Sequence, residues 1–126
     1  MSASGGTWLG VGFAGFALAL AAGAFGTHAL GARLDARSLA LWDTAARYLA
    51  YGSVALALAG LAAARWPAAT WSRPAWFLAV GTAIFAVTVA ALALGGPRWL
   101  GAVTPIGGTL MILGVAWLGW IALRAA

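Results

Sequence analysis

The chain has 126 residues, of which 64% are hydrophobic and only 7% are charged, and it contains no cysteine. A soluble domain carries about 25% charged residues, so the composition excludes an ordinary soluble protein. The absence of cysteine excludes disulfides and thiolate metal sites. The net charge of +5 comes from seven arginines scattered singly between apolar runs. Because proteins that bind nucleic acid gather their basic residues on one face, we expect no nucleic acid partner.

Four long uncharged runs dominate the sequence, at residues 5–31, 48–64, 74–97 and 99–123. Each is about long enough to cross a hydrocarbon core roughly 30 Å thick at 1.5 Å per helical residue. The pattern predicts an all-α fold, an integral membrane four-helix bundle, in a single domain over residues 1–126. The expected spans are residues 7–27, 44–64, 75–95 and 100–123.

The first expected span ends in the most unusual local feature of the chain. Gly23 and Gly26 are three residues apart and should loosen the helix just before His28, the only histidine. A histidine near a membrane boundary can handle protons or a ligand, or it can make a buried hydrogen bond to Asp43, Tyr48 or a backbone carbonyl. A signal peptide is the alternative for this segment, but no lysine or arginine precedes Trp8 to form its basic start.

The second expected helix has an amphipathic first part. Asp35 is a candidate N-cap for a helix that starts near Ala36. Asp43 and Arg47 are four residues apart, so they share a helix face and can pair. We therefore expect residues 36–47 to lie near the membrane interface and to continue into the second span without a break.

Prolines and glycines mark the limits of the last two helices. Pro74 suits the first turn of the third helix, where its missing N–H costs nothing. Gly95, Gly96 and Pro97 form a strong helix breaker. Pro105 frees a backbone carbonyl within the fourth span, so we expect either a kink or a late helix start there.

Small residues are frequent in the spans, and Gly6 and Gly10 form a GxxxG pattern at the start of the first. In lipid, close backbone packing between small residues is what holds helices together. This packing can lie inside one chain or form a face for an oligomer, and the pattern leaves both alternatives open.

The arginines do not orient the chain in the membrane. Three lie on the side that holds the N-terminus and three or four on the opposite side, so the positive-inside rule gives no clear direction. We expect arginines at helix ends to meet lipid phosphates.

Three motifs occur in a recognisable order: GAFGTHAL at 23–30, WDTAARY at 42–48 and TPIGG at 104–108. Together they resemble the small membrane-protein family catalogued as domain of unknown function 423, which includes YgdD-like proteins and is similar to transmembrane protein 256. The resemblance covers nearly the whole chain. It implies four helices in a bacterial inner membrane and brings no settled biochemical activity.

The chain departs from the family pattern at Gly52, where members commonly carry a second histidine, so the resemblance implies no two-histidine site here. We hypothesise that the three motifs fix how the first, second and fourth helices meet. The candidate polar and structural cluster comprises His28, Trp42, Asp43, Arg47, Tyr48, Thr104 and Pro105, and the candidate packing positions are Gly23, Gly26, Gly107 and Gly108.

We expect a small multi-pass protein of the bacterial inner (plasma) membrane that is not an enzyme, because no spacing marks an activated nucleophile with its base. It would act as an accessory or interaction component, surrounded by membrane lipid, in a homo-oligomer or a larger complex. The alternative is a small-solute or ion permease or channel with a polar pocket around His28, Asp43 and Arg47. A lone histidine with two carboxylates makes a poor metal site, and we expect neither metal nor cofactor.

Overall fold

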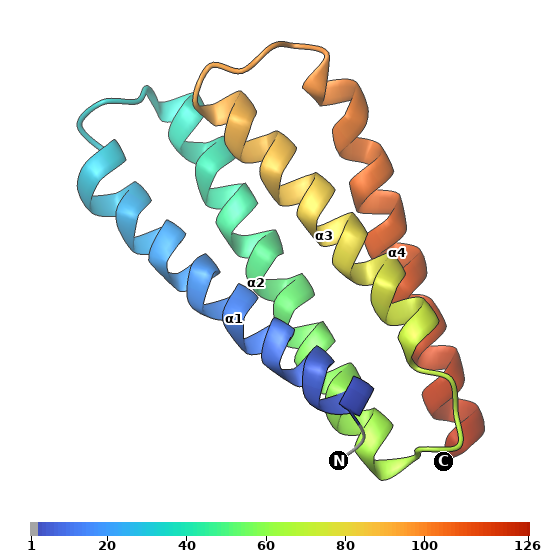
Figure 1. Cartoon of the computed structure of the whole chain (residues 1–126). Helices are drawn as coiled ribbons and strands as arrows, with labels where there is room; N and C mark the ends of the chain where they lie inside the picture. Colours follow the sequence, from blue (N-terminus) through green and yellow to red (C-terminus); the bar gives the residue numbers. More distant parts are fainter. Residues whose placement is uncertain (1–2) are drawn as a thin grey trace.

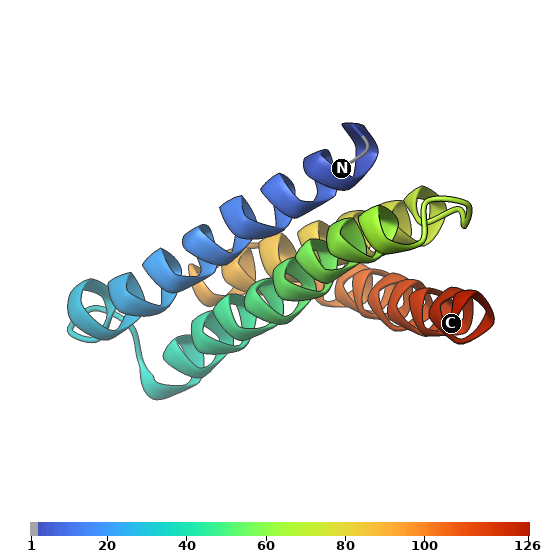
Figure 2. The same ribbon diagram turned by 90° about the horizontal axis from the view of Figure 1, so that it is seen from below.

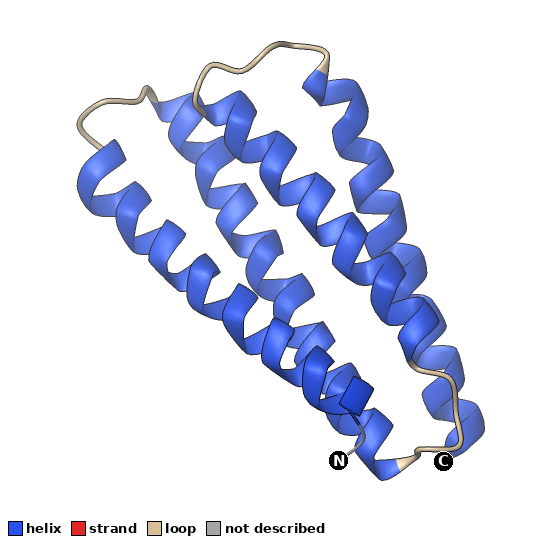
Figure 3. Cartoon of the chain, viewed as in Figure 1, coloured by secondary structure: helices blue, strands red, loops and turns tan. Residues whose placement is uncertain are grey.

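Four long helices make up nearly all of the structure, a computed structural model that describes residues 3–126 (Figures 1 and 3). No strand occurs over that range. The elements are α1 (Ala3–Phe25), a π-helical turn η1 (Gly26–Leu30), α2 (Ala36–Arg65), α3 (Ser72–Ala93) and α4 (Leu100–Ala125). All four helices are long and apolar enough to cross a membrane, as an all-α integral membrane fold requires. The first two residues of the expected domain lie outside the described residues.

The helices run up and down, so that their connections alternate between two ends of the molecule (Figure 1). The terminal end holds the start of α1, the connection 66–71 and the end of α4. The opposite end holds the connections 31–35 and 94–99. α2 has 30 residues, which is about 45 Å at 1.5 Å per residue and exceeds a hydrocarbon core of roughly 30 Å. Its excess length is the amphipathic first part, where Asp43 and Arg47 are exposed.

The four helices do not close into a ring. α1 packs on α2, α2 on α3 and α3 on α4, whereas α2 touches α4 only slightly. Figure 2 shows α1 and α4 on opposite sides of the central α2–α3 pair. The apolar segments of α1 and α4 are each 17% buried, against 39% for α2 and for α3. The two outer helices therefore present most of their surface to the surroundings.

Backbone contacts at glycine hold neighbouring helices together. A Cβ added at Gly60 would lie 2.5 Å from the backbone N of Leu9, and one at Gly81 would lie 2.6 Å from the backbone N of Met111. Real Cβ atoms do not approach so closely, so only glycine allows these helix crossings. Leu78 of α3 is fully buried against Gly114 of α4. The core is consequently thin and made largely of small side chains, as expected where lipid supplies no hydrophobic force between helices.

The helix ends follow from local chemistry. Asp35 is the N-cap of α2, and its Oδ1 accepts a 2.8 Å hydrogen bond from the backbone N–H of Ser38. This bond favours the charged carboxylate and holds the pKa of Asp35 below its usual value. α3 ends at Ala93, and Gly95 turns the chain with a φ of +92°, a conformation that suits glycine.

α4 begins at Leu100 and passes through Pro105, so of the two outcomes expected at this proline, a kink or a late helix start, the late start does not occur. Two threonine hydroxyls donate to carbonyls in this part of the helix. The hydroxyl of Thr104 donates to the carbonyl of Leu100 at 3.0 Å, and that of Thr109 donates to the carbonyl of Pro105 at 2.8 Å. Neither bond reaches the carbonyl of Gly101, which is the one that Pro105 leaves without an N–H donor.

Replacing Gly81 by alanine should lower the free energy of unfolding by about 1–3 kcal/mol, because the added methyl group would be forced against the backbone of α4. SDS-induced unfolding of the protein in mild detergent, followed by circular dichroism, measures the change. Gly119→Ala is the matched control, since a Cβ at Gly119 meets nothing within 4 Å. There the better helix propensity of alanine should leave stability unchanged or raise it by up to about 1 kcal/mol. Equal effects of the two substitutions would contradict the close α3–α4 contact.

Candidate functional site

The first two motifs meet at a joint between α1 and α2. The indole Nε1–H of Trp42 donates a 2.7 Å hydrogen bond to the carbonyl of Ala22. A Cβ at Gly26 would lie 2.5 Å from Cδ1 of Trp42, so glycine makes room for the ring. Phe25 adds a tilted aromatic contact to Trp42, with ring centroids 6.1 Å apart. Trp42 and Gly26 thus fix where the end of α1 meets the start of α2.

The π-helical turn η1 occupies most of the GAFGTHAL motif. A π-helix bonds each carbonyl to the N–H five residues on instead of four. Carbonyls where the α-helical and π-helical patterns meet therefore lose their regular hydrogen-bond partner. Two side-chain donors reach that region: Trp42 bonds to Ala22, and the hydroxyl of Thr27 donates to the carbonyl of Gly23 at 3.1 Å. Gly23 itself has open space beside it. The loosening expected from the two glycines takes the form of this wider turn.

His28 is exposed on η1 and makes no hydrogen bond or ion pair within the described chain. Of the two alternatives for His28, the buried hydrogen bond to Asp43, Tyr48 or a backbone carbonyl is therefore not formed. The reason is its place on the turn: Gly26 and Leu30 are the buried residues of η1, and His28, two residues from each, points away from α2.

Asp43 and Arg47 form an ion pair with 3.0 Å between Oδ2 and Nη2, and their side chains are 64% and 57% exposed. An exposed pair of this kind adds little stability. Asp43 also borders a shallow groove of about 250 Å³ together with Thr27 and Trp42, but neither His28 nor Arg47 lines it. The structure therefore does not gather His28, Asp43 and Arg47 into one polar pocket.

Tyr48 lies on a different side of α2 from the groove that Asp43 borders. Its ring contacts Phe85 of α3 at a centroid distance of 4.8 Å and Tyr51 at 5.4 Å. These rings line an apolar groove of about 610 Å³ that also includes Gly108 and Met111. Tyr48 is thus part of an aromatic surface over α3 and α4, away from η1.

The third motif joins α4 to α3. The hydroxyls of Thr104 and Thr88 are 2.7 Å apart, and because the proton of Thr104 goes to the carbonyl of Leu100, Thr88 donates to Thr104. A Cβ at Gly107 would lie 2.6 Å from the backbone N of Phe85, so this glycine is a close backbone contact. The hypothesis that the motifs unite the first, second and fourth helices is wrong, because they form two separate joints, α1–α2 and α3–α4.

Two packing residues, Thr88 at the α3–α4 joint and Thr82 at the contact of α3 with α2, were not predicted from the sequence. Thr88 pairs with Thr104, and the only signal for it was a hydroxyl within an otherwise apolar span. Thr82 is buried on α3 with no hydrogen-bond partner for its Oγ1, and it fills the space beside Gly52. A side chain larger than glycine at that position would displace it. In residues 3–126, no three His, Asp or Glu side chains come together in a way that could hold a metal ion.

These features define a small multi-pass helical membrane protein. The chain belongs to the family described as Protein of unknown function (DUF423), whose model matches residues 22–108. That segment contains all three motifs and both joints.

Relatives share most of the chain's length. A UPF0382 membrane protein of Staphylococcus epidermidis is 36% identical over 101 residues, which are 80% of each chain. One from Staphylococcus saprophyticus is also 36% identical, over 80% of this chain and 82% of its own. One from Staphylococcus aureus is 31% identical over 109 residues, covering 86% and 84%. No solved structure matches the chain at a significant level.

Replacing Trp42 by phenylalanine should lower the free energy of unfolding by about 1 kcal/mol, because the part-buried carbonyl of Ala22 loses its side-chain donor. SDS-induced unfolding in mild detergent again measures the effect. Trp99→Phe is the control, as Trp99 is 65% exposed. His28→Ala should change stability by less than about 0.5 kcal/mol. A larger loss for His28→Ala than for Trp42→Phe would contradict this assignment of the joint.

Proposed function

We propose that this protein is a non-enzymatic accessory component of the bacterial inner membrane. It acts by binding within the membrane either further copies of itself, in a homo-oligomer, or other proteins, in a larger complex. The observation that carries the proposal is the outward face of α1. A stripe of small, exposed residues runs along nearly the whole helix, at Gly6, Gly10, Ala14, Ala17, Ala21 and Ala24. We call these residues the α1 stripe.

The α1 stripe lies opposite the face with which α1 packs on its own chain. The inward residues include Trp8, Gly12 and Ala19, all buried. The stripe recurs at intervals of three and four residues, which keeps its members on one side of the helix. Small residues in that pattern let a second helix approach closely, and this contact drives association in lipid. α1 therefore has small-residue surfaces on two sides, of which its own chain uses one.

The distribution of polar groups supports a binding role over chemistry or transport. An enzyme needs a nucleophile and a base within reach of each other, and the exposed His28 has no such partner among the described residues. A permease needs a polar path through the molecule. The groups on which that alternative rested do not share a cavity, and two of them, Asp43 and Arg47, form an exposed ion pair with each other.

Cysteine cross-linking in native membranes tests the proposal directly, because the chain has no cysteine of its own. Ala17→Cys places a single thiol in the middle of the α1 stripe. We expect a short bis-maleimide to convert a large share of this variant into a defined adduct, either a dimer or a product with another membrane protein. Ile112→Cys is the control, since Ile112 is 71% exposed on the outer helix α4.

The two variants separate specific contact from random collision. An adduct from Ala17→Cys that Ile112→Cys does not give, and that Ala21→Leu in the same chain suppresses, supports association through the stripe. If Ala17→Cys stays monomeric under conditions where its thiol reacts fully with a monofunctional maleimide, α1 faces only lipid and the proposal fails.

A further inference from the structure

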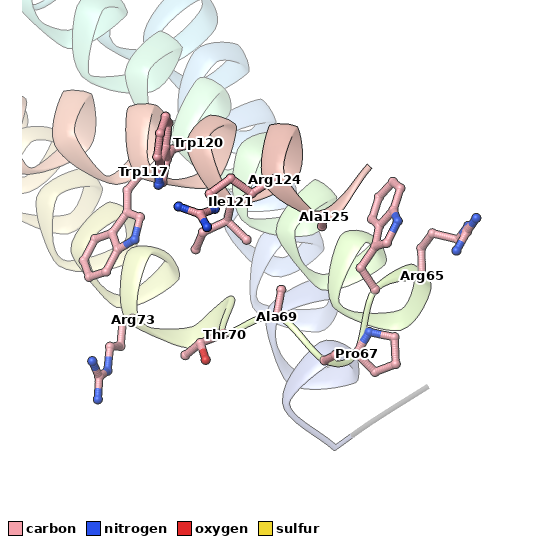
Figure 4. Close-up of a pocket in the computed structure, with 12 residues that line it drawn as sticks. Arg65, Pro67, Ala69, Thr70, Arg73, Trp117, Trp120, Ile121, Arg124 and Ala125 are labelled. Carbon is pink, nitrogen blue, oxygen red and sulfur yellow. The ribbon is translucent and has the colours of Figure 1, made fainter.

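A broad basin lies at the terminal end, where α2 ends, α3 begins and α4 ends (Figure 4). Its volume is about 720 Å³. The connection 66–71 forms its floor, and the last turns of α4 form one wall. Three arginines border it, Arg65, Arg73 and Arg124, one from each of the three helices.

The charged side chains that line the basin are all arginines. The chain has only two acidic residues, Asp35 and Asp43, and both lie at or near the start of α2, at the opposite end. No acidic side chain therefore neutralises the three arginines. Two of them rest on tryptophans instead: Arg65 lies 5.0 Å from the ring centre of Trp66, and Arg124 lies 5.6 Å from that of Trp120. Stacking of this kind holds a guanidinium in place while leaving N–H donors at its edge for phosphate oxygens.

The start of α3 adds backbone donors to the same place. Trp71, its N-cap residue, makes no side-chain capping bond, and its indole donates instead to the carbonyl of Trp66 at 2.9 Å. The first N–H groups of a helix point out of its end and attract anions. α3 has 22 residues, and Arg73 in its first turn borders the basin. Pro74 in the same turn has no N–H, so the helix start offers the N–H groups of Ser72 and Arg73 beside the Arg73 guanidinium.

The remaining wall is apolar and continues toward the membrane. Trp117, Trp120 and Ile121 of α4 line it, and Trp117 packs edge-on against Phe77 of α3, with ring centroids 5.3 Å apart. Six of the eight tryptophans lie near the terminal end, at positions 8, 66, 71, 76, 117 and 120. Tryptophan gathers at the headgroup level of a membrane. The basin therefore opens at the depth where lipid headgroups meet their acyl chains.

We propose that this basin is a binding site for an anionic glycerophospholipid, with the headgroup at the rim that Arg65, Arg73 and Arg124 border and an acyl chain along Trp117 and Ile121. Basic pockets between membrane helices bind acidic headgroups in this way. A zwitterionic lipid fits the site less well, because its ammonium group would face the same three guanidinium groups. The site does not depend on association through the α1 stripe.

Native mass spectrometry of the full chain tests the proposal. The protein is transferred from mild detergent into micelles that contain equal amounts of phosphatidylglycerol and phosphatidylcholine, and the lipids that stay bound are counted. We expect phosphatidylglycerol to be retained in preference. The double variant Arg73→Gln/Arg124→Gln should weaken that retention by about fivefold per arginine, or about 25-fold in all, from the contribution of each basic residue near an anionic membrane surface.

The matched control is Arg33→Gln/Arg37→Gln, which removes the same charge from the opposite end. Retention should be unchanged in this variant, and Arg73→Lys/Arg124→Lys, which keeps the charge, should retain the lipid within about fivefold. Equal losses in the two glutamine variants, or equal retention of the two lipids by the unsubstituted protein, would overturn the site. Displacement of the lipid by excess inorganic phosphate alone would also overturn it, since the basin would then bind phosphate without acyl chains.

Discussion

Direct backbone contact at glycine is the interaction on which this structure depends. Lipid is as apolar as the side chains of the spans, so burying leucine between two helices gains little over leaving it in the bilayer. Helices are held instead by close approach, which Gly60 allows between α1 and α2 and which Gly81 and Gly107 allow between α3 and α4. The Trp42–Ala22 and Thr88–Thr104 hydrogen bonds then fix each pair near the opposite end. The two joints position the outer helices, and with them both the α1 stripe and the basic basin.

The same constraint explains what the sequence could and could not predict. Span number and approximate limits follow from uncharged length, and the cap at Asp35 and the breaker at Gly95 follow from local chemistry. Which side of a span packs on its neighbours cannot be predicted from the sequence, because α1, α3 and α4 are apolar on all sides and carry no amphipathic signal. Only α2 has one, and there the amphipathic start with its Asp43–Arg47 pair was foreseeable. The outward position of His28 and the open arrangement of α1 and α4 required the structure.

The two ends of the molecule differ in chemistry although they carry similar numbers of arginines. At the opposite end, Asp35 and Asp43 partly neutralise the arginines, and the exposed ion pair and η1 present mixed charge. At the terminal end, three arginines share a tryptophan-rich rim with no acidic residue. A count of arginines by side does not capture this difference, which is why charge alone left the orientation open. The two proposed surfaces also separate in space: the α1 stripe runs along one outer helix, and the basin is bordered by the other.

Labelling of single cysteines with a membrane-impermeant maleimide in intact cells tests the central claim, four crossings of the bilayer, most directly. Cysteines placed at Ala69 and Ala126 of the terminal end should either both be labelled or both be protected. Those at Ala32 and Pro97 of the opposite end should then show the other result. Each variant reports alone because the chain has no native cysteine. Identical labelling at Ala69 and Pro97, after permeabilised cells have shown that both thiols react, would mean that α3 does not cross the membrane and would contradict the account.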